Sequence, residues 1–272
     1  MCRWIAYLGP ALRLDSLLVQ PSHSLLMQSK HALESTYAIN ADGFGVGWYT
    51  SESERPGLYH ETRPAWNDEN LKSLASHLSS HMFMAHIRAA TSVVSRSNCH
   101  PFAHDKWLFQ HNGVIGGFDR IRQHLDCQID DSIYARKRGN TDSETMFGLC
   151  LTEGLKEDVP GAIERMIGRV EGARRQFNIE EAFRMTVAIA DGHQLWAARY
   201  QSDGDGPSLY HTADHSGVAG AVGVDAQIES EATIVVSEPL DEVSNHWVEV
   251  PTRSVLIASA SGATLQPFKT AF

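Results

Sequence analysis

A cysteine follows the initiating methionine in Met1–Cys2–Arg3. Because the initiator Met is usually removed before a small residue, the mature chain is expected to begin with Cys2. The pKa of a free α-amine lies near 8 and that of a thiol near 8.5, so the amine can accept the thiol proton directly or through water. Cys2 would then carry both a nucleophile and its base. The alternative is an ordinary residue at position 2 with no chemical role.

Two further motifs could bind a substrate or stabilise a transition state. Arg88 ends an expected strand, and its planar fork suits a substrate carboxylate, although an internal Asp or Glu could neutralise it equally well. Asn112–Gly113 follows another expected strand. The side-chain amide of Asn112 and the backbone N–H of Gly113 suit an oxyanion hole, but Asn-Gly is also a strong signal for a hairpin turn. Both interpretations stay open for each motif.

Two other segments carry polar residues of uncertain use. Cys99 and His100 are adjacent and point to opposite faces of an extended chain, so they are not expected to form a catalytic pair. His100 precedes Pro101, which holds it extended, and it is either structural or lines a site. Asp142 lies in Thr141–Glu144, which has capping-box spacing. Asp142 therefore either belongs to a helix start or binds a substrate ammonium group.

The hydrophobic patterns predict the elements that must position these groups. Helices are expected over 70–81, 141–155 and 162–170, and strands over 45–49, 82–88, 106–111, 185–190, 194–200, 233–237 and 254–258. Asp191–His193 is expected to join two strands as a hairpin. The strands pair locally and the helices come in separate blocks, which favours an α+β layered sandwich over a doubly wound parallel sheet.

Composition excludes several classes of protein. The 272 residues are 42% hydrophobic and 21% charged, which predicts one soluble domain over 2–272. A formal charge of −10 without a Lys/Arg run argues against nucleic acid or an anionic membrane as partner. No apolar run reaches the roughly 18 residues of a membrane span, and no secretory signal is visible, so a cytoplasmic location is predicted.

Cofactor and scaffold signals are equally sparse. The four cysteines form no CxxC pair, and the fourteen histidines lack metal-ligand spacing, so neither a disulfide scaffold nor a metal site is expected. The alternating glycines of 43–47 do not form a dinucleotide loop, and close backbone packing is the better interpretation. No cofactor is predicted.

The ordered set of motifs is more specific than any one of them. The motifs lie within residues 2–155 in this order: Cys2, Asp42–Gly43, Arg88 with Thr91, His100–Pro101, Asn112–Gly113 and Thr141–Glu144. Their order and spacing closely resemble those of the class II glutamine amidotransferases, which are N-terminal-nucleophile hydrolases. The resemblance implies a four-layer αββα sandwich, which agrees with the predicted elements. The remainder of the chain is expected to complete that sandwich.

The resemblance also implies roles for individual residues. Cys2 would be the nucleophile that forms a γ-glutamyl thioester. Arg88 and Asp142 would hold the α-carboxylate and α-ammonium groups of a glutamyl substrate, and Asn112 and Gly113 would form the oxyanion hole. Further substrate-binding residues in matching motifs are Thr91 and His100.

Glutamine amidotransferases usually carry an acceptor domain, such as an isomerase or synthetase domain, and no such domain is expected within these residues. The sequence looks more like a stand-alone subset. Over residues 1–3, 21–29, 40–47 and 98–102 it is similar to a fungal glutathione-degrading γ-glutamyl amidase subunit and to an ergothioneine-pathway γ-glutamyl amidohydrolase. Hydrolysis of glutamine or another γ-glutamyl compound is therefore expected, with the leaving group on loops such as 50–56 or 127–139. The alternatives are a glutaminase subunit that passes ammonia to a separate protein partner, a non-catalytic γ-glutamyl-binding subunit, and a metal-dependent hydrolase. A homo-oligomer is also open.

Overall fold

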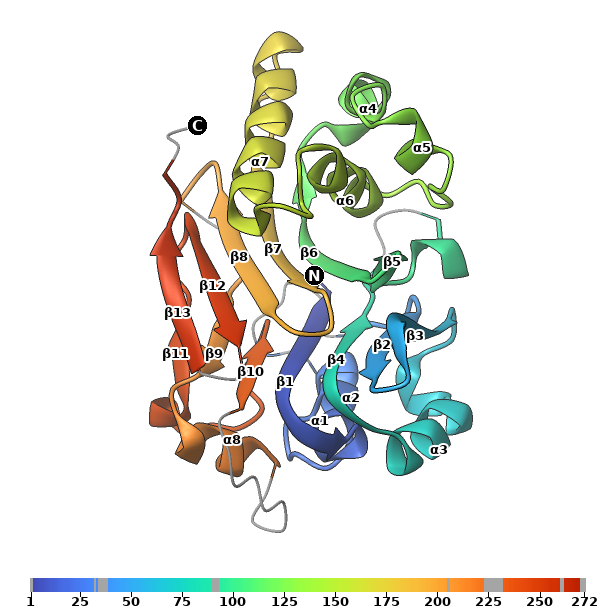
Figure 1. Cartoon of the computed structure of the whole chain (residues 1–272), viewed down its shortest axis with the longest axis vertical. Coiled ribbons are helices and arrows are strands. Elements are labelled where there is room, and N and C mark those ends of the chain that lie inside the picture. Colours follow the sequence, from blue (N-terminus) through green and yellow to red (C-terminus); the bar gives the residue numbers. More distant parts are fainter. Residues whose placement is uncertain are drawn as a thin grey trace.

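Two antiparallel β-sheets form the centre of the molecule, and helices cover their outer faces (Figure 1). The computed structural model describes residues 2–31, 33, 39–89, 93–204, 206–222, 232–259 and 262–269. Among the described helices, none is both long and apolar enough to cross a bilayer.

The larger sheet has seven strands in the order β11-β9-β10-β1-β4-β2-β3. Its strands are β1 (Arg3–Arg13), β2 (Phe44–Thr50), β3 (Ser53–Glu61), β4 (Ser79–Ile87), β9 (Tyr210–Thr212), β10 (Thr233–Val236) and β11 (Trp247–Glu249). The helices on its outer side are α1 (Asp15–Leu18), α2 (Leu25–Lys30), α3 (Glu69–His77) and α8 (His215–Val222). A buried cluster that includes Ile5, Tyr7 and Phe83 fills the space between this sheet and its helices.

The second sheet has six strands in the order β13-β12-β8-β7-β6-β5. Its strands are β5 (Phe102–His104), β6 (Trp107–Ile115), β7 (Phe183–Ala190), β8 (Leu195–Gln201), β12 (Ser254–Ser259) and β13 (Gly262–Pro267). The helices on its outer side are α4 (Phe118–Asp126), α5 (Asp131–Tyr134), α6 (Asp142–Thr152) and α7 (Val159–Gln176). The buried cluster beneath them includes Phe109, Phe147 and Ile167.

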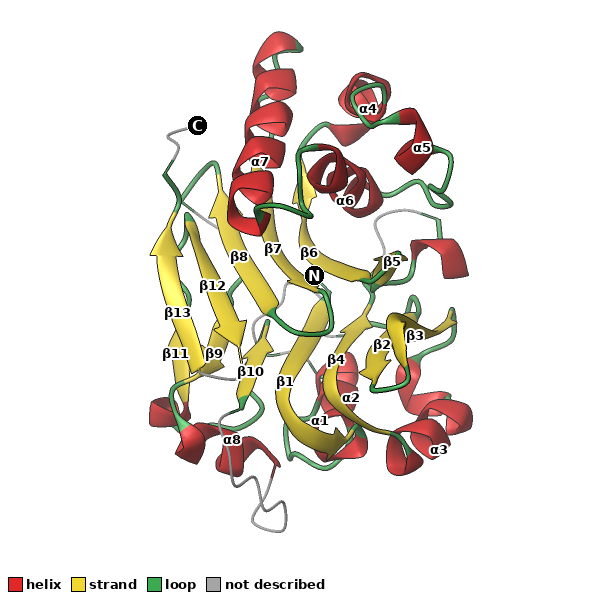
Figure 2. Cartoon of the chain, viewed as in Figure 1, coloured by secondary structure: helices red, strands yellow, loops and turns green. Residues whose placement is uncertain are grey.

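A third buried cluster lies between the two sheets. Trp4 and Ala6 of β1 belong to it, whereas Ile5 and Tyr7 of the same strand belong to the cluster under the helices. The strand therefore buries both faces, as its period of two requires. Figure 2 shows the result, with the sheets between two groups of helices. The layer order is αββα.

The structure corrects several predicted element boundaries. The helix expected over 70–81 ends at His77, because Leu78 is extended and β4 begins at Ser79. The helix expected over 141–155 ends at Thr152, and that expected over 162–170 spans Val159–Gln176. The hairpin around Asp191–His193 is confirmed, since β7 and β8 pair on either side of it.

The interpretation of Asn112–Gly113 as a hairpin turn is wrong. Strand β6 continues through both residues to Ile115, and they pair with Thr186 and Met185 of β7. The chain turns only after that, at Gly116–Gly117, where Gly117 has a φ of 64°. The Asn-Gly pair therefore lies inside a sheet, and the glycine at position 113 is not required for a turn.

Candidate active site

Cys2 lies at the point where β1 begins beside the end of β4. Arg3 pairs with Ile87, so Cys2 is next to the residues that follow β4. Its Sγ lies 3.4 Å from the amide nitrogen and 3.6 Å from the carbonyl oxygen of Ala89. Burial raises the pKa of the Cys2 thiol, and the Ala89 amide and the charge of Arg88 oppose that shift. The neutral thiol is therefore favoured, and a nucleophilic Cys2 needs a nearby base.

Arg88 is brought beside Cys2 by the same strand end. Its side chain is buried, and Nη1 donates to the carbonyl of Val93 over 3.1 Å. Its backbone N–H donates to the carbonyl of Gly43 (2.8 Å) and its carbonyl accepts from the Asp42 amide (3.1 Å), so the Asp42–Gly43 motif lies against it. Gly43 has a φ of 106°, and a Cβ there would lie 2.8 Å from the carbonyl oxygen of Glu61. Only glycine fits that position.

The close packing expected for the alternating glycines of 43–47 is confirmed. A Cβ on Gly45 would lie 2.2 Å from the carbonyl oxygen of His100, and one on Gly47 would lie 2.8 Å from the ring of Pro101. Strand β2 can therefore lie directly against the 100–101 segment. Thr91, predicted to bind substrate, lies outside the described residues.

The side-chain amide of Asn112 is buried and unsatisfied. Only 2% of the residue is exposed, and neither Nδ2 nor Oδ1 has a hydrogen-bond partner within the described part of the chain. Such a group costs about 1–3 kcal/mol, so a native structure keeps one for a reason. Gly113 follows with a φ of 149°, and a Cβ there would lie 2.0 Å from the carbonyl oxygen of Arg184. Glycine is needed because strand β7 approaches so closely.

Hydrogen bonds between the two sheets fix the end of β6 relative to the start of β1. They run from His86 Nε2 to the His111 carbonyl (3.0 Å), from Gln110 Nε2 to the Ile5 carbonyl (3.0 Å), and from Trp4 Nε1 to Thr186 Oγ1 (3.2 Å). Thr186 Oγ1 in turn donates to the Asn112 carbonyl over 3.4 Å. Cys2 on one sheet and Asn112 on the other are thus held by buried, directional contacts.

Asp142 is the first residue of α6 and joins the same region. Its Oδ2 accepts from the Ile115 amide (3.0 Å), and its Oδ1 accepts from the Ser143 amide (2.8 Å). Its negative charge acts to raise the pKa of the Cys2 thiol, which reflects its nearness to that residue. The structure therefore brings together Cys2, Arg88, Asn112, Gly113 and Asp142.

The predicted capping box is half formed. Thr141 Oγ1 accepts from the Glu144 amide (3.2 Å), as expected for an N-cap. The Glu144 carboxylate does not return to Thr141. It accepts instead from the amides of Arg138 (2.8 Å) and Gly139 (2.6 Å), so it holds the loop that leads into the helix.

His100, predicted to be either structural or part of a site, is buried against β4. Its ring stacks on that of His86 with centroids 4.2 Å apart, and its peptide bond to Pro101 is cis. Burial lowers the pKa of His86 to about 3 and that of His100 well below its ordinary value. Both rings are therefore neutral at physiological pH. Burial also raises the pKa of the neighbouring Cys99 thiol to about 11, which disfavours the nucleophilic thiolate.

Asn98 has a structural role that the sequence did not indicate. Its Nδ2 donates to the Val93 carbonyl (2.9 Å) and to Asn140 Oδ1 (2.8 Å), and its Oδ1 accepts from the Asn140 amide (3.1 Å). The Val93 carbonyl also accepts from Arg88. Asn98 therefore connects the loop before α6 to Arg88, the predicted carboxylate-binding residue. Its only signal in the sequence is its place beside Cys99–His100.

A model of the class II glutamine amidotransferases matches residues 22–270 of the chain. The chain belongs to this family. It is 32% identical to the probable glutamine amidotransferase DUG3 of Saccharomyces cerevisiae, over 98% of this chain and 84% of that protein. It is 27% identical to the gamma-glutamyl-hercynylcysteine sulfoxide hydrolase of Mycolicibacterium smegmatis, over 94% of this chain and 95% of that protein.

Solved structures of class II glutamine amidotransferases have the same fold. A class II domain protein from Silicibacter pomeroyi superposes with a TM-score of 0.75 at 36% identity, over 99% of this chain and all of that one. The phosphoribosylpyrophosphate amidotransferase of B. subtilis superposes with a TM-score of 0.67 at 14% identity, over this whole chain and 50% of that one. The predicted four-layer sandwich of the N-terminal-nucleophile hydrolases is confirmed.

Proposed function

We propose that this chain hydrolyses the γ-amide bond of a γ-glutamyl compound through a thioester on Cys2. The observation that carries the proposal is the Asn112 amide, which is buried and has no hydrogen-bond partner among the described residues. Through Thr186 and Trp4, Asn112 is linked to the start of β1, where Cys2 lies. An unsatisfied donor next to a nucleophile suits a negative charge that exists only during the reaction.

The glutamyl head group would be held at both of its charged ends. Arg88 presents a planar guanidinium that suits the α-carboxylate, and Asp142 presents a carboxylate that suits the α-ammonium. The charges of these two residues act on the pKa of the Cys2 thiol with opposite signs, so both lie near it. A glutamyl group between them would direct its γ-carbonyl towards the thiol.

The reaction would have two halves. With Met1 removed, the α-amine of Cys2 takes the thiol proton, and the sulfur attacks the γ-carbonyl carbon. The oxyanion accepts hydrogen bonds from Asn112 Nδ2 and the Gly113 amide. When this tetrahedral intermediate collapses, the C–N bond breaks, and the leaving amine takes the proton from the α-ammonium group of Cys2. Water, deprotonated by the same amine, then attacks the thioester carbonyl and releases glutamate and the thiol.

A cavity of about 710 Å³ is well placed to receive the leaving group. Its lining includes Arg55 and Pro56, which belong to strand β3 and not to a loop as predicted over 50–56. It also includes Tyr134–Arg138 from the predicted loop 127–139, in which Asp131–Tyr134 form α5. Two of its lining residues neighbour the candidate site. Cys99 has its Sγ against Gly43, and Glu144 is on the first turn of α6 with Asp142.

The charges of this cavity favour an anionic leaving group. Five cationic side chains line it against two carboxylates; they are Arg55, Arg96, Arg136, Lys137 and Arg138, against Asp105 and Glu144. Three of the cations have acidic partners, Glu61 for Arg96, Asp105 for Arg136 and Asp126 for Lys137. In the described part of the chain, Arg55 and Arg138 form no ion pair. We therefore propose a γ-glutamyl amide whose amine carries a carboxylate.

The intact mass of the purified protein, before and after incubation with 6-diazo-5-oxo-norleucine, tests the catalytic proposal. This reagent is an electrophile that mimics glutamine. The expected result is a parent without Met1 and one stable adduct, mapped to Cys2 and absent from Cys2→Ala. A parent that retains Met1 and forms no adduct would count against catalysis and favour a binding subunit. Turnover of γ-glutamyl amides by the isolated chain would separate a hydrolase from a subunit that requires a partner.

The leaving-group proposal has its own test. Arg55→Met/Arg138→Met should raise KM for γ-glutamyl amides with a carboxylate in the amine by about 5-fold at low salt, since each exposed charge is worth up to about 1 kcal/mol. KM for glutamine should not change. The control is Arg175→Met, which removes an exposed charge on α7. An equal rise for both substrates would contradict the proposal.

A further inference from the structure

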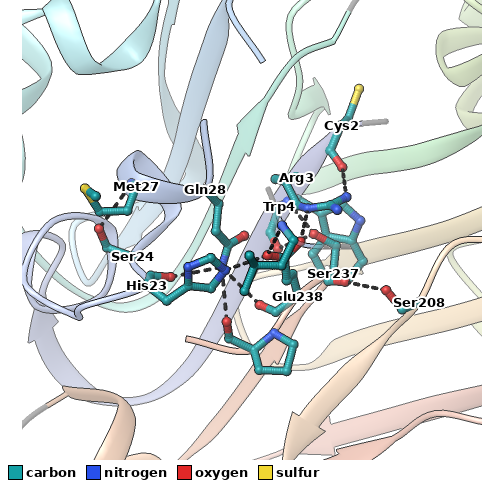
Figure 3. A network of polar contacts seen from close by, with 12 residues as sticks. Cys2, Arg3, Trp4, His23, Ser24, Met27, Gln28, Ser208, Ser237 and Glu238 are labelled. Atoms are coloured by element: carbon teal, nitrogen blue, oxygen red, sulfur yellow. Dashed lines mark hydrogen bonds and ion pairs between the residues drawn. The ribbon is translucent and has the colours of Figure 1, made fainter. Parts of the chain in front are cut away.

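A buried ion pair lies directly behind the nucleophile (Figure 3). Arg3 Nε is 2.6 Å from Glu238 Oε2, and the two side chains are 1% and 2% exposed. The same guanidinium uses Nη1 to donate to the carbonyl of Cys2 over 3.0 Å. Arg3 therefore links the backbone of the nucleophile to a carboxylate 235 residues away in the sequence.

The other oxygen of Glu238 holds the segment around α2. Its Oε1 is 2.5 Å from His23 Nε2 and accepts from the Leu33 amide over 2.9 Å. Gln28 adds three contacts from Nε2, to the carbonyls of His23 (3.0 Å), Glu238 (3.2 Å) and Pro239 (3.3 Å). These contacts account for the His23 and Gln28 of the 21–29 motif, which the catalytic proposal leaves without a role.

Stability alone does not explain this arrangement. Removing an ion pair from water costs about as much as the attraction returns, so an apolar pair of similar size often stabilises a protein equally well. What the pair does supply is geometry, because a guanidinium donates in fixed directions that a lysine cannot reproduce. Here those directions lead to Glu238 and to the Cys2 carbonyl.

The guanidinium acts on the backbone and not on the sulfur. Figure 3 shows the Cys2 thiol directed away from Arg3, while the carbonyl faces it. The charge of Arg3 is matched by Glu238, and among the described side chains the cation that lowers the pKa of the Cys2 thiol is Arg88. Losing Arg3 should therefore change where the thiol lies more than how acidic it is.

We propose that Arg3 and Glu238 are positioning residues for Cys2. Together they hold residue 2 at the end of β4 and fasten the His23–Leu33 segment to the same carboxylate. This inference rests on the proposed function, since it assigns the pair to the geometry of attack on a γ-glutamyl carbonyl. A displacement of about 1 Å can lower such a rate by about 100-fold.

The test compares two reagents on the full-length protein. 6-Diazo-5-oxo-norleucine must bind as a glutamyl group before it reacts, whereas iodoacetamide needs only an accessible thiolate. In Glu238→Gln and Arg3→Lys, the first labelling rate should fall by about 100-fold. The iodoacetamide rate at Cys2 and its pH profile should stay as in the wild type.

The chain offers a matched control. Arg174 and Glu171 form another buried pair, 2.7 Å apart and 8% and 9% exposed, on α7. Glu171→Gln should lower Tm as much as Glu238→Gln does, yet leave both labelling rates unchanged. If Glu238→Gln does not fold, the double variant Arg3→Met/Glu238→Met removes both charges at once, and it should fold and still label slowly with the glutamine mimic.

Each outcome decides between the two proposals. Wild-type labelling rates in Arg3→Lys and in the double variant would overturn the positioning role and leave the proposed function intact. Equal losses with both reagents would overturn it too, because the thiol itself would then be disturbed. A wild-type protein that does not react with the glutamine mimic would instead overturn the proposed function, and the inference with it.

Discussion

Replacing Asn112 with alanine should lower activity without lowering stability. Losing one oxyanion-hole donor costs about 3–4 kcal/mol in the transition state, or about 10²–10³-fold in kcat. In the folded protein the amide has no partner among the described residues and is 2% exposed, so its removal relieves a desolvation cost of about 1–3 kcal/mol. The cavity that it leaves costs about 1 kcal/mol at about 24 cal/mol per Å³. The variant should therefore be as stable as the wild type or up to about 2 kcal/mol more stable.

The measurements are kcat for a γ-glutamyl amide and the free energy of unfolding in guanidinium chloride. Gln110→Ala is the matched control, because Gln110 lies two residues earlier on β6 and is buried on the same face. Its Nε2 donates to the Ile5 carbonyl, so this variant should lose about 1–3 kcal/mol of stability and keep more of its activity. The reasoning is refuted if Asn112→Ala is destabilised by more than about 2 kcal/mol while kcat is unchanged, since the amide would then be structural.

Three other predictions follow from the same geometry. Burial lowers the pKa of His86 to about 3. Below pH 6.5, His86 is therefore protonated in the unfolded chain but stays neutral in the native protein. This residue alone should lower the free energy of unfolding by about 2 kcal/mol at pH 5 relative to pH 8. Denaturant unfolding at both pH values should show that loss in the wild type and in His193→Gln, which changes an exposed histidine, but less of it in His86→Gln. Gly113→Ala should lower the free energy of unfolding by more than about 2 kcal/mol, because its Cβ would lie 2.0 Å from the Arg184 carbonyl oxygen of β7; a variant with wild-type Tm would contradict this. Thr141→Ala should lose about 1 kcal/mol with the helix cap and should raise KM, as steady-state kinetics would show, because Asp142 follows it directly.

The sequence predicted the layers of the fold better than it predicted single elements. Strands β4, β7, β8, β10 and β12 were expected nearly where they lie, because their patterns are apolar and their turns carry clear signals. Strand β1 was not expected. Its residues 3–8 are buried on both faces, so it shows no alternation of polar and apolar residues, and it contains an arginine whose partner is 235 residues distant. No local pattern can show such a pairing.

The Asn112–Gly113 pair shows a different limit. Asn-Gly usually predicts a turn because both residues adopt positive φ easily. Here the glycine is needed for a close approach of two strands, and the asparagine is needed, in our proposal, for an interaction absent from the resting protein. Local propensity and functional requirement select the same two residues for unrelated reasons. In the sequence, only the ordered set of motifs favoured the oxyanion-hole interpretation, and it is the structure that rules out the turn.

The placement of the polar groups between the sheets explains how the site is held together. Small side chains fill much of that interface, among them Ala6, Ala188 and Ala197, and an apolar interface of this kind resists separation far more than it resists sliding. Hydrogen bonds have directions, and an unmade one in the interior is costly. Among the hydrogen bonds that cross the interface, those from Trp4, His86 and Gln110 therefore set the register of β6 against β1. Because the proposed nucleophile and oxyanion hole belong to different sheets, that register is the condition under which they can act on one carbonyl group.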